Sequence, residues 1–219
     1  MELQEISANE LVKIGDLLRT IYVAGANLTG LGLLNTVHVL LAYIASSANP
    51  KMTRFTILDP GEVDYVLLKD SPFLNGEIIS NDDEILDVLE TATTIKFDFQ
   101  NVIVLNHYDW LKNSTNGEYN KRIRGVVQKL VEKAREQNCV LIVVDRNVEV
   151  DYDLPDFDAV LCFKLENAEK SRKVLGQEGA EKLADKGDSL YYNRRTGQII
   201  HGQIPLLKSE LINTILQIE

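Results

Sequence analysis

The stretch IYVAGANLTGLG, from Ile21 to Gly32, decides the fold. Its apolar start predicts a strand, which meets Gly25, and Gly30 follows five residues later. The mostly apolar segment that comes next predicts a helix over Leu33–Ala45. A strand, the spacing Gly-x-x-x-x-Gly and a helix form the layout of a phosphate-binding P-loop. On this spacing alone, a plain strand-to-helix turn is the better interpretation.

The chemistry of a P-loop is missing from this loop. Working P-loops cradle phosphates with backbone N–H groups, neutralise them with Lys and hold Mg²⁺ with Ser or Thr. No lysine occurs between Lys13 and Lys51, so a shift of alignment supplies none. The one loop hydroxyl precedes the second glycine. We therefore expect degenerate nucleotide-site positions at Gly25, Ala26, Asn27, Leu28, Thr29, Gly30, Leu31 and Gly32.

Composition describes a globular chain with a substantial core. Its 219 residues are 45% hydrophobic and 26% charged, and without a repeat or low-complexity linker they predict one domain over residues 1–219. The net charge of −10 and the pI near 4.9 argue against a nucleic-acid partner, which needs a basic footprint. The acidic runs NDDE and EVDYDLPDFD predict solvated loops or, as the alternative, a contact with a basic or otherwise complementary partner. No apolar run approaches the roughly 20 residues that span a bilayer, and the N-terminus lacks the pattern of a signal peptide.

Cysteine and histidine spacing predicts no metal site. Cys139 and Cys162 lie in apolar runs and are expected to be buried free thiols. His38, His107 and His201 are far apart, and no Cys/His group has metal-ligand spacing.

Apolar runs alternate with amphipathic segments along the chain. Short runs rich in β-branched residues, such as NVIVL and VLIVV, are typical of strands buried on both faces of a parallel sheet. The pattern predicts an α/β fold with a mostly parallel central sheet flanked by helices. The expected strands are Thr20–Ala24, Arg54–Leu58, Asn101–Leu105, Val140–Val144, Ala159–Phe163 and Ser189–Tyr192. The expected helices are Leu33–Ala45, Asp82–Lys96, Tyr119–Gln137 and Leu207–Ile218.

Two further strand ends lack nucleotide chemistry. A P-loop ATPase ends a second buried strand in an acid for Mg²⁺, usually followed by Glu. Here the strand runs into Asn106 and His107, and a neutral amide is a poor ligand for a hard cation. A polar sensor is expected at the end of the next core strand, where the chain has Val144. Three losses in one chain predict that this domain does not hydrolyse ATP.

At this point the chain resembles the FtsK/SpoIIIE-type RecA-like motor ATPases. VAGANLTGLG resembles their P-loop, RFTILDP their RF-x-L-x-DP strand, and VIVLNHYDW their Walker B strand. The most specific match is SRKVLGQEGAEKLADKGDSLYY, Ser171–Tyr192, against their GAEKL segment. IHGQI at Ile200–Ile204 resembles the strand that follows. The resemblance implies a RecA-like P-loop NTPase fold over roughly Ile21–Ile204.

This chain is acidic and lacks the catalytic residues of the family. In these respects it is most similar to the degenerate C-terminal ATPase domain of type VII secretion coupling proteins, the EssC/EccC kind. The resemblance implies a cytoplasmic domain of a longer, membrane-anchored protein of a Gram-positive bacterium. It implies secreted protein substrates and neighbouring ATPase domains as partners, and an oligomeric ring in the full-length protein. No cofactor is expected here, with ATP and Mg²⁺ bound only weakly if at all. Two residues at family arginine positions either pair with local acids or reach a neighbour's nucleotide: Arg146 and Arg172.

Three functions remain open. The first is a non-catalytic module that binds secreted substrates, for which Tyr108, Trp110 and Leu111 either form the contact or pack beneath a loop. The second is a weak nucleotide-binding regulator that uses the backbone N–H groups of the loop. The third is a DNA translocase domain, which the acidic balance disfavours.

Overall fold

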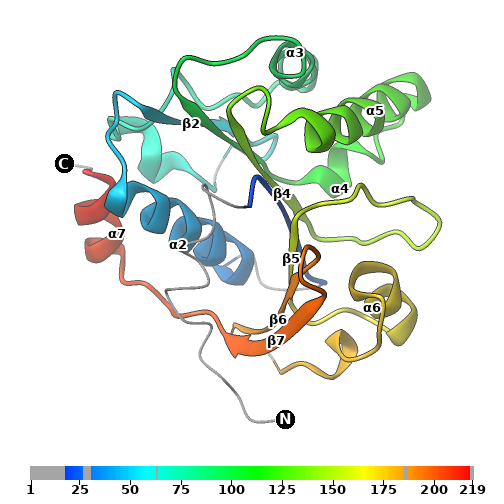
Figure 1. Ribbon diagram of the computed structural model, residues 1–219. Coiled ribbons are helices and arrows are strands. Elements are labelled where there is room, and N and C mark those ends of the chain that lie inside the picture. The colour runs from blue at the N-terminus through cyan, green and yellow to red at the C-terminus, as the bar shows by residue number, and fades with distance from the viewer. Residues whose placement is uncertain (1–17, 27–30, 63, 185–186, 218–219) are drawn as a thin grey trace.

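The predicted strands form one sheet in the computed structural model, which describes residues 18–26, 31–62, 64–184 and 187–217. Within this part of the chain the strand order is β2-β3-β4-β1-β5-β6-β7 (Figure 1). Strands β1 to β5 pair in parallel, and β6 and β7 add an antiparallel hairpin beside β5. The bounds are β1 (Thr20–Ala24), β2 (Thr53–Leu58), β3 (Gln100–Leu105), β4 (Cys139–Asp145), β5 (Ala159–Cys162), β6 (Asp188–Asn193) and β7 (Gln198–Gln203).

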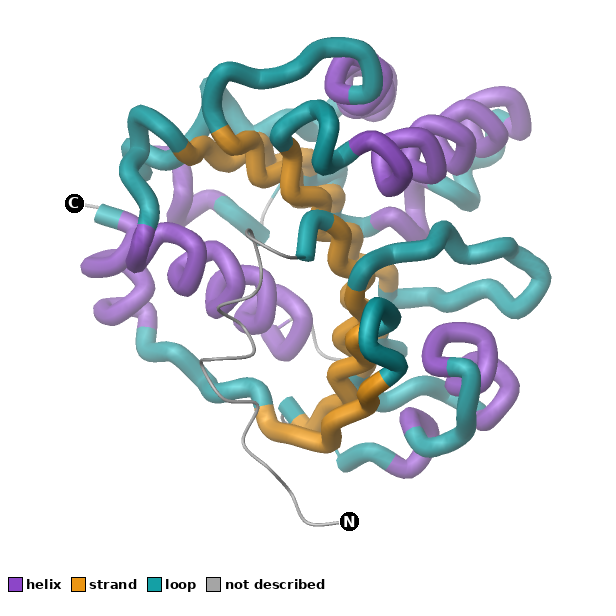
Figure 2. The backbone as a smooth tube through the Cα atoms, viewed as in Figure 1, coloured by secondary structure: helices purple, strands orange, loops and turns teal. Residues whose placement is uncertain are grey.

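Helices cover both faces of this sheet. Figure 2 shows α2 and α7 on one face and α3, α5 and α6 on the other. The bounds are α2 (Leu31–Ser47), α3 (Asp82–Ala92), α4 (Tyr108–Leu111), α5 (Gly117–Lys133), α6 (Ala168–Leu175) and α7 (Ser209–Leu216), with 3₁₀ helices η1 (Val66–Asp70) and η2 (Ala180–Lys182). Among the described residues, no helix combines the length and the apolar composition needed to cross a bilayer.

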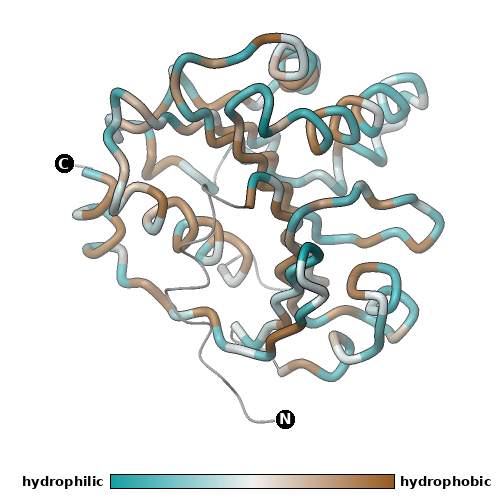
Figure 3. The backbone as a smooth tube through the Cα atoms, in the orientation of Figure 1, coloured by the Kyte–Doolittle hydropathy of each residue, from teal (hydrophilic) through white to brown (hydrophobic). Residues whose placement is uncertain are grey.

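Alternate residues of each parallel strand enter different hydrophobic cores. In β1, Ile21 and Val23 join the core under α2 and α7, whereas Tyr22 and Ala24 join the core under α3 and α5. A strand buried on both faces favours apolar side chains at nearly every position, which explains the continuous apolar runs in the sequence. The same strands form the hydrophobic centre of the molecule in Figure 3.

The predicted α/β class and mostly parallel sheet are confirmed, and the boundaries differ where capping decides them. Helix α3 ends at Ala92 rather than Lys96, because the Thr93 hydroxyl donates to the Glu90 carbonyl and closes the last turn. Helix α5 begins two residues early, where the Asn116 side chain accepts from the second and third helical N–H groups. The short helices α4 and α6 were not predicted, since one or two turns leave little periodicity.

The carboxyl ends of the parallel strands meet at one edge of the sheet. Strand β1 lies where the order reverses, between β4 and β5. In open α/β sheets, ligands bind in the crevice beyond the strand ends at such a position. The residues that follow β1, β2, β3 and β4 therefore form the candidate site.

Candidate functional site

In the described part of the glycine-rich loop, the first two backbone N–H groups donate hydrogen bonds to carbonyls of the same domain. Gly25 N donates to the Asp145 carbonyl at 3.2 Å, and Ala26 N donates to the Lys164 carbonyl at 2.9 Å. Gly32 lies in the first turn of α2, where its carbonyl accepts from Thr36 Oγ1 at 2.8 Å. The predicted positions Asn27, Leu28, Thr29 and Gly30 lie outside the described residues, as does the side chain of Leu31.

Asn106, at the end of β3, bridges two carboxylates. Its Nδ2 donates to Asp59 Oδ1 and to Asp64 Oδ2, each at 2.9 Å, and the residue is 1% exposed. Asp59 follows β2 and is fully buried, with backbone N–H groups of Gly61 and Asp64 on its two oxygens. An aspartate in place of Asn106 would put three carboxylates together, and their mutual repulsion would raise the pKa of at least one of them. The neutral amide therefore fits this structure better than the acid of a working site.

His107 lies beside this bridge in an unusual backbone conformation. Its φ of 49° is left-handed, and its Nε2 is 3.4 Å from Asp64 Oδ2. Burial, and then the neighbouring Arg146, lower the pKa of His107, so the imidazole is neutral at pH 7. A Cβ on Gly61 would lie 3.1 Å from His107 Nε2, so a larger residue there would require the imidazole to move slightly.

Arg146 closes the cluster from the end of β4. Its Nη2 donates to Asp64 Oδ2 at 2.8 Å, and its guanidinium contacts the His107 ring. Burial alone would raise the pKa of Asp64, but hydrogen bonds from Arg146 and Asn106 lower it overall. We call Asp59, Asp64, Asn106, His107 and Arg146 the outer cluster. Arg146 is thus held by its own domain in this conformation.

The other family arginine lies apart from the outer cluster. Arg172 is on α6, where it pairs with Glu178 and both side chains are about half exposed. The pairing with local acids that the sequence offered as one interpretation is therefore present for both arginines. Whether either reaches a neighbouring domain stays a prediction.

Asp59, Asp64 and His107 also form the donor set in which a cation would fit. One ligand atom from each lies within 4.8 Å of the others, and two carboxylates with an imidazole suit a divalent transition metal. Sequence spacing could not reveal this group, because the three residues follow two different strands. In the described structure, Arg146 and Asn106 supply the positive charge and the donors instead.

Val144, the predicted sensor position, is 1% exposed and packs in the core under α2. The polar group is one residue later. Asp145 is fully buried, and its Oδ2 lies 2.6 Å from Lys112 Nζ and accepts from the Tyr22 hydroxyl. Burial raises the pKa of Asp145, which the lysine, the tyrosine and Asn147 N–H oppose. We call Tyr22, Lys112 and Asp145 the inner cluster.

Of the three predicted contact residues, two are buried and one is exposed. Tyr108 and Leu111 are 0% and 1% exposed and pack under the loop, so they offer no contact in this conformation. Trp110 is 54% exposed and stacks on His107, with ring centroids 3.8 Å apart. Tyr108, Asp109 and Leu111 of the one-turn helix α4 are buried and Trp110 is the exposed residue, a division that the sequence YDWL does not reveal.

No family model matches the chain. Among curated proteins it is similar to the DNA translocase FtsK of Borreliella burgdorferi, at 25% identity over 86% of this chain and 27% of that protein. It is also similar to the FtsK of Chlorobaculum tepidum, at 22% identity over 96% of this chain and 30% of the relative. The chain thus spans less than a third of the length of these relatives.

Solved structures share the fold. The pCW3 conjugation coupling protein TcpA, in a monomer form with ATPγS, aligns with a TM-score of 0.71 and 16% identity over 91% of this chain and 64% of that one. ATPases 2 and 3 of EssC from Geobacillus thermodenitrificans align at 0.69 and 12%, over 90% and 42%. The cytoplasmic domain of the Thermomonospora curvata type VII secretion ATPase EccC aligns at 0.67 and 15%, over 91% and 27%. The chain therefore has the RecA-like P-loop NTPase fold and resembles FtsK/SpoIIIE-type ATPase domains such as those of EssC.

Proposed function

We propose that this domain is a non-catalytic FtsK/SpoIIIE-like domain of a type VII secretion coupling protein. In this role it engages secreted protein substrates and packs against catalytically competent ATPase domains during export. The similarity to EssC and EccC supports a role in type VII secretion. The residues at the strand ends support the loss of catalysis.

The observation that carries the proposal is the hydrogen bonding of Asn106. The position that would bind magnesium through a carboxylate instead donates to Asp59 and Asp64. Because the amide bridges the two carboxylates, it offsets their repulsion without a metal ion. Arg146 neutralises the Asp64 carboxylate from within the domain. The loop sequence offers no lysine for the β- and γ-phosphates.

Calorimetric titration with Mg-ATP and a phosphate-release assay test the loss of catalysis. We expect no hydrolysis and only weak binding that does not depend on magnesium. The triple variant Leu31→Lys, Gly32→Ser, Asn106→Asp restores the missing groups together and serves as the comparison. Tight, magnesium-dependent binding with turnover by the wild-type domain would refute the proposal.

Trp110 is the residue we assign to substrate contact. It is the exposed large aromatic of the nucleotide corner in the described structure, and its ring is fixed by the stack on His107. A rigid, half-exposed tryptophan is typical of binding hot spots. Pull-down of secreted helical-hairpin proteins with this domain as bait should succeed, and Trp110→Ala should reduce it at least about tenfold. Retention of every substrate by the variant would remove Trp110 from the contact.

A weak ATP-binding regulatory domain is the second candidate. The strand β1 and the helix α2 that flank a phosphate cradle are present in the fold, and the glycine spacing between them is retained in the sequence. Binding of ATP without hydrolysis, together with no pull-down of any secreted protein, would favour this role over substrate engagement.

A DNA translocase domain is the third candidate, and the function named for the FtsK relatives favours it. It requires salt-sensitive duplex binding, which a chain of net charge −10 opposes. A gel-shift assay at low salt should show no retardation of duplex DNA.

A further inference from the structure

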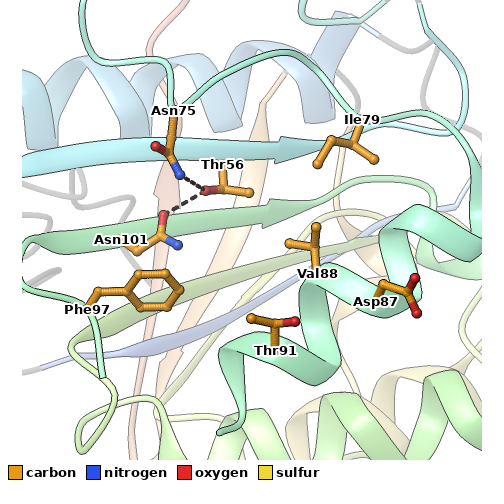
Figure 4. A pocket seen from close by; sticks show the side chains of 8 residues that line it. All are labelled: Thr56, Asn75, Ile79, Asp87, Val88, Thr91, Phe97 and Asn101. Atoms are coloured by element: carbon orange, nitrogen blue, oxygen red, sulfur yellow. Dashed lines mark hydrogen bonds between the residues drawn. The ribbon is translucent and has the colours of Figure 1, made fainter. Parts of the chain in front are cut away.

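A pocket of about 300 Å³ lies beside the edge strand β2, away from the nucleotide corner. Its floor comes from β2 and β3, one wall from α3, and the others from the segment before α3 and the loop after it (Figure 4). Asn101 lies five residues before Asn106 on β3, so the two sites are about 16 Å apart along the strand. The lining residues are Thr56, Asn75, Ile79, Asp87, Val88, Thr91, Phe97 and Asn101.

The floor of this pocket is a chain of hydrogen bonds. Asn75 Nδ2 donates to Thr56 Oγ1 at 3.2 Å, and Thr56 Oγ1 donates to Asn101 Oδ1 at 2.8 Å. Asn101 is 1% exposed, and because its Oδ1 accepts from Thr56, its Nδ2 faces the pocket (Figure 4). Figure 4 shows this amide directed into the pocket beside the Phe97 ring. Because the Thr56 hydroxyl can donate or accept, both amides can turn together, and Asn101 can present either a donor or an acceptor.

The polar floor interrupts an apolar pattern. Ile103 and Leu105 point from β3 into the core under α3, and Asn101 has the same parity. On β2, Leu58 also points into this core, and Thr56, two residues earlier, lies on the same face of the strand. A sheet that needed only core packing would carry apolar residues at Thr56 and Asn101, because buried amides cost free energy unless they are hydrogen-bonded.

The segment of the chain that carries α3 is acidic. Between Glu77 and Asp98 the chain has seven acids and one base, Lys96. Helix α3 has five acids and no base, and Asp87 at the pocket is the one charged lining residue among the described ones. Such a field favours a cationic ligand and disfavours phosphates and carboxylates.

We propose that this pocket receives an arginine side chain from a protein partner. The aliphatic stem packs on Ile79 and Val88, and the planar guanidinium lies on Phe97. The Thr91 hydroxyl and the turned Asn101 amide accept its hydrogen bonds, and Asp87 supplies the opposite charge. Arginine fits better than lysine because its flat group stacks on an aromatic ring and donates in several directions.

NMR titration with acetyl-arginine-methylamide tests the pocket directly. We expect millimolar binding, with the largest backbone shifts at Thr56, Thr91 and Asn101. The matched ligand is acetyl-citrulline-methylamide, which has the same shape without the charge, and it should bind at least about fivefold more weakly. Free arginine should bind like the capped form, because the contacts are to its side chain.

The variant Asp87→Asn should weaken arginine binding about two- to fivefold, as expected for one exposed charge. Asp83→Asn is the matched control, because it makes the same change on the same helix outside the pocket lining. Thr91→Trp fills the pocket from an exposed helix position and should abolish the shifts. Equal binding of citrulline, equal effects at Asp83 and Asp87, or shifts confined to the α3–α5 surface would overturn the proposal. None of these results depends on whether the nucleotide corner binds ATP.

Discussion

Two polar clusters lie at the carboxyl ends of neighbouring strands, and they neutralise charge in different ways. In the inner cluster, the side chains of Lys112 and Asp145 are both 0% exposed and form a direct pair. In the outer cluster, the side chains of Asp64 and Arg146 are 16% and 18% exposed and form an ion pair. The Asn106 amide also donates a hydrogen bond to Asp64. The inner cluster depends on a full charge, whereas the outer cluster has replaced a charge by an amide.

The difference follows from what each cluster faces. Lys112 reaches Asp145 from the end of α4, and because both side chains are 0% exposed the two charges must neutralise each other within the protein. The outer cluster lies beside the exposed Trp110, where solvent screens part of the repulsion between carboxylates. Substitutions in the inner cluster should therefore affect stability most.

Lys112→Met should have the largest effect. It leaves the Asp145 carboxylate buried without a cation, which should lower the free energy of unfolding by about 3 to 5 kcal/mol. Urea unfolding followed by circular dichroism measures the loss. Lys129→Met, an exposed lysine on α5, is the control and should change stability by less than about 0.5 kcal/mol. A Lys112→Met protein as stable as the control would show that Asp145 is neutral in the folded state.

The sequence predicted the sheet well and the two clusters only in part. Continuous β-branched runs identify buried parallel strands, because every residue of such a strand meets a core. Asn106, His107 and Arg146 were found because they occupy motif positions on strand ends. Asp64 and Lys112 were missed, since each reaches its cluster from a loop or a one-turn helix with no periodic signal. Their partners are 42 and 33 residues away in sequence, a pairing that only the strand order specifies.

Asn106→Asp should have the second largest effect. Restoring the acid of a working ATPase removes both amide donors and adds a third carboxylate, which should cost about 2 to 3 kcal/mol at pH 7. Asn101→Asp is the matched control at the other end of β3. Asn101 is equally buried but has Thr56 as its neighbour, which can donate to a carboxylate, so its cost should be smaller. Equal losses in the two variants, measured by urea unfolding, would mean that the bridged carboxylates do not matter.

Arg146→Gln should cost about 1 to 2 kcal/mol, because Asp64 loses a charged hydrogen-bond donor at a partly exposed position. The folded state lowers the pKa of Asp64, so this stabilisation is fully present above the ordinary value of about 4. It is lost as pH falls through the lower folded value. Unfolding curves of wild type and variant should therefore converge as the pH decreases from 5 to about 2. A constant difference over this range would exclude Asp64 as the partner that matters.

The same variant tests the donor set beneath Arg146. Without the guanidinium, Asp59, Asp64 and His107 keep their ligand atoms within 4.8 Å and lose their positive neighbour. Titration with Mn²⁺ or Co²⁺ should show binding by Arg146→Gln that wild type lacks. Adding Asp64→Asn should remove it. Equal metal binding by wild type would show that the arginine does not compete for this site.

Trp110→Ala should have the smallest effect on stability. The variant tests whether the tryptophan beside the outer cluster serves the fold or a contact at the surface. The ring is 54% exposed, and its contact with His107 is a single stack, so the cost should be about 0.5 to 1 kcal/mol. Tyr108→Phe on the same helix is the control, because it removes only a buried hydroxyl that pairs with Tyr152 at 2.9 Å. If Trp110 serves a partner, its substitution should reduce substrate pull-down while the domain unfolds almost as in wild type. A large loss of stability would instead assign the tryptophan to the fold, as a support that holds His107 of the outer cluster in place.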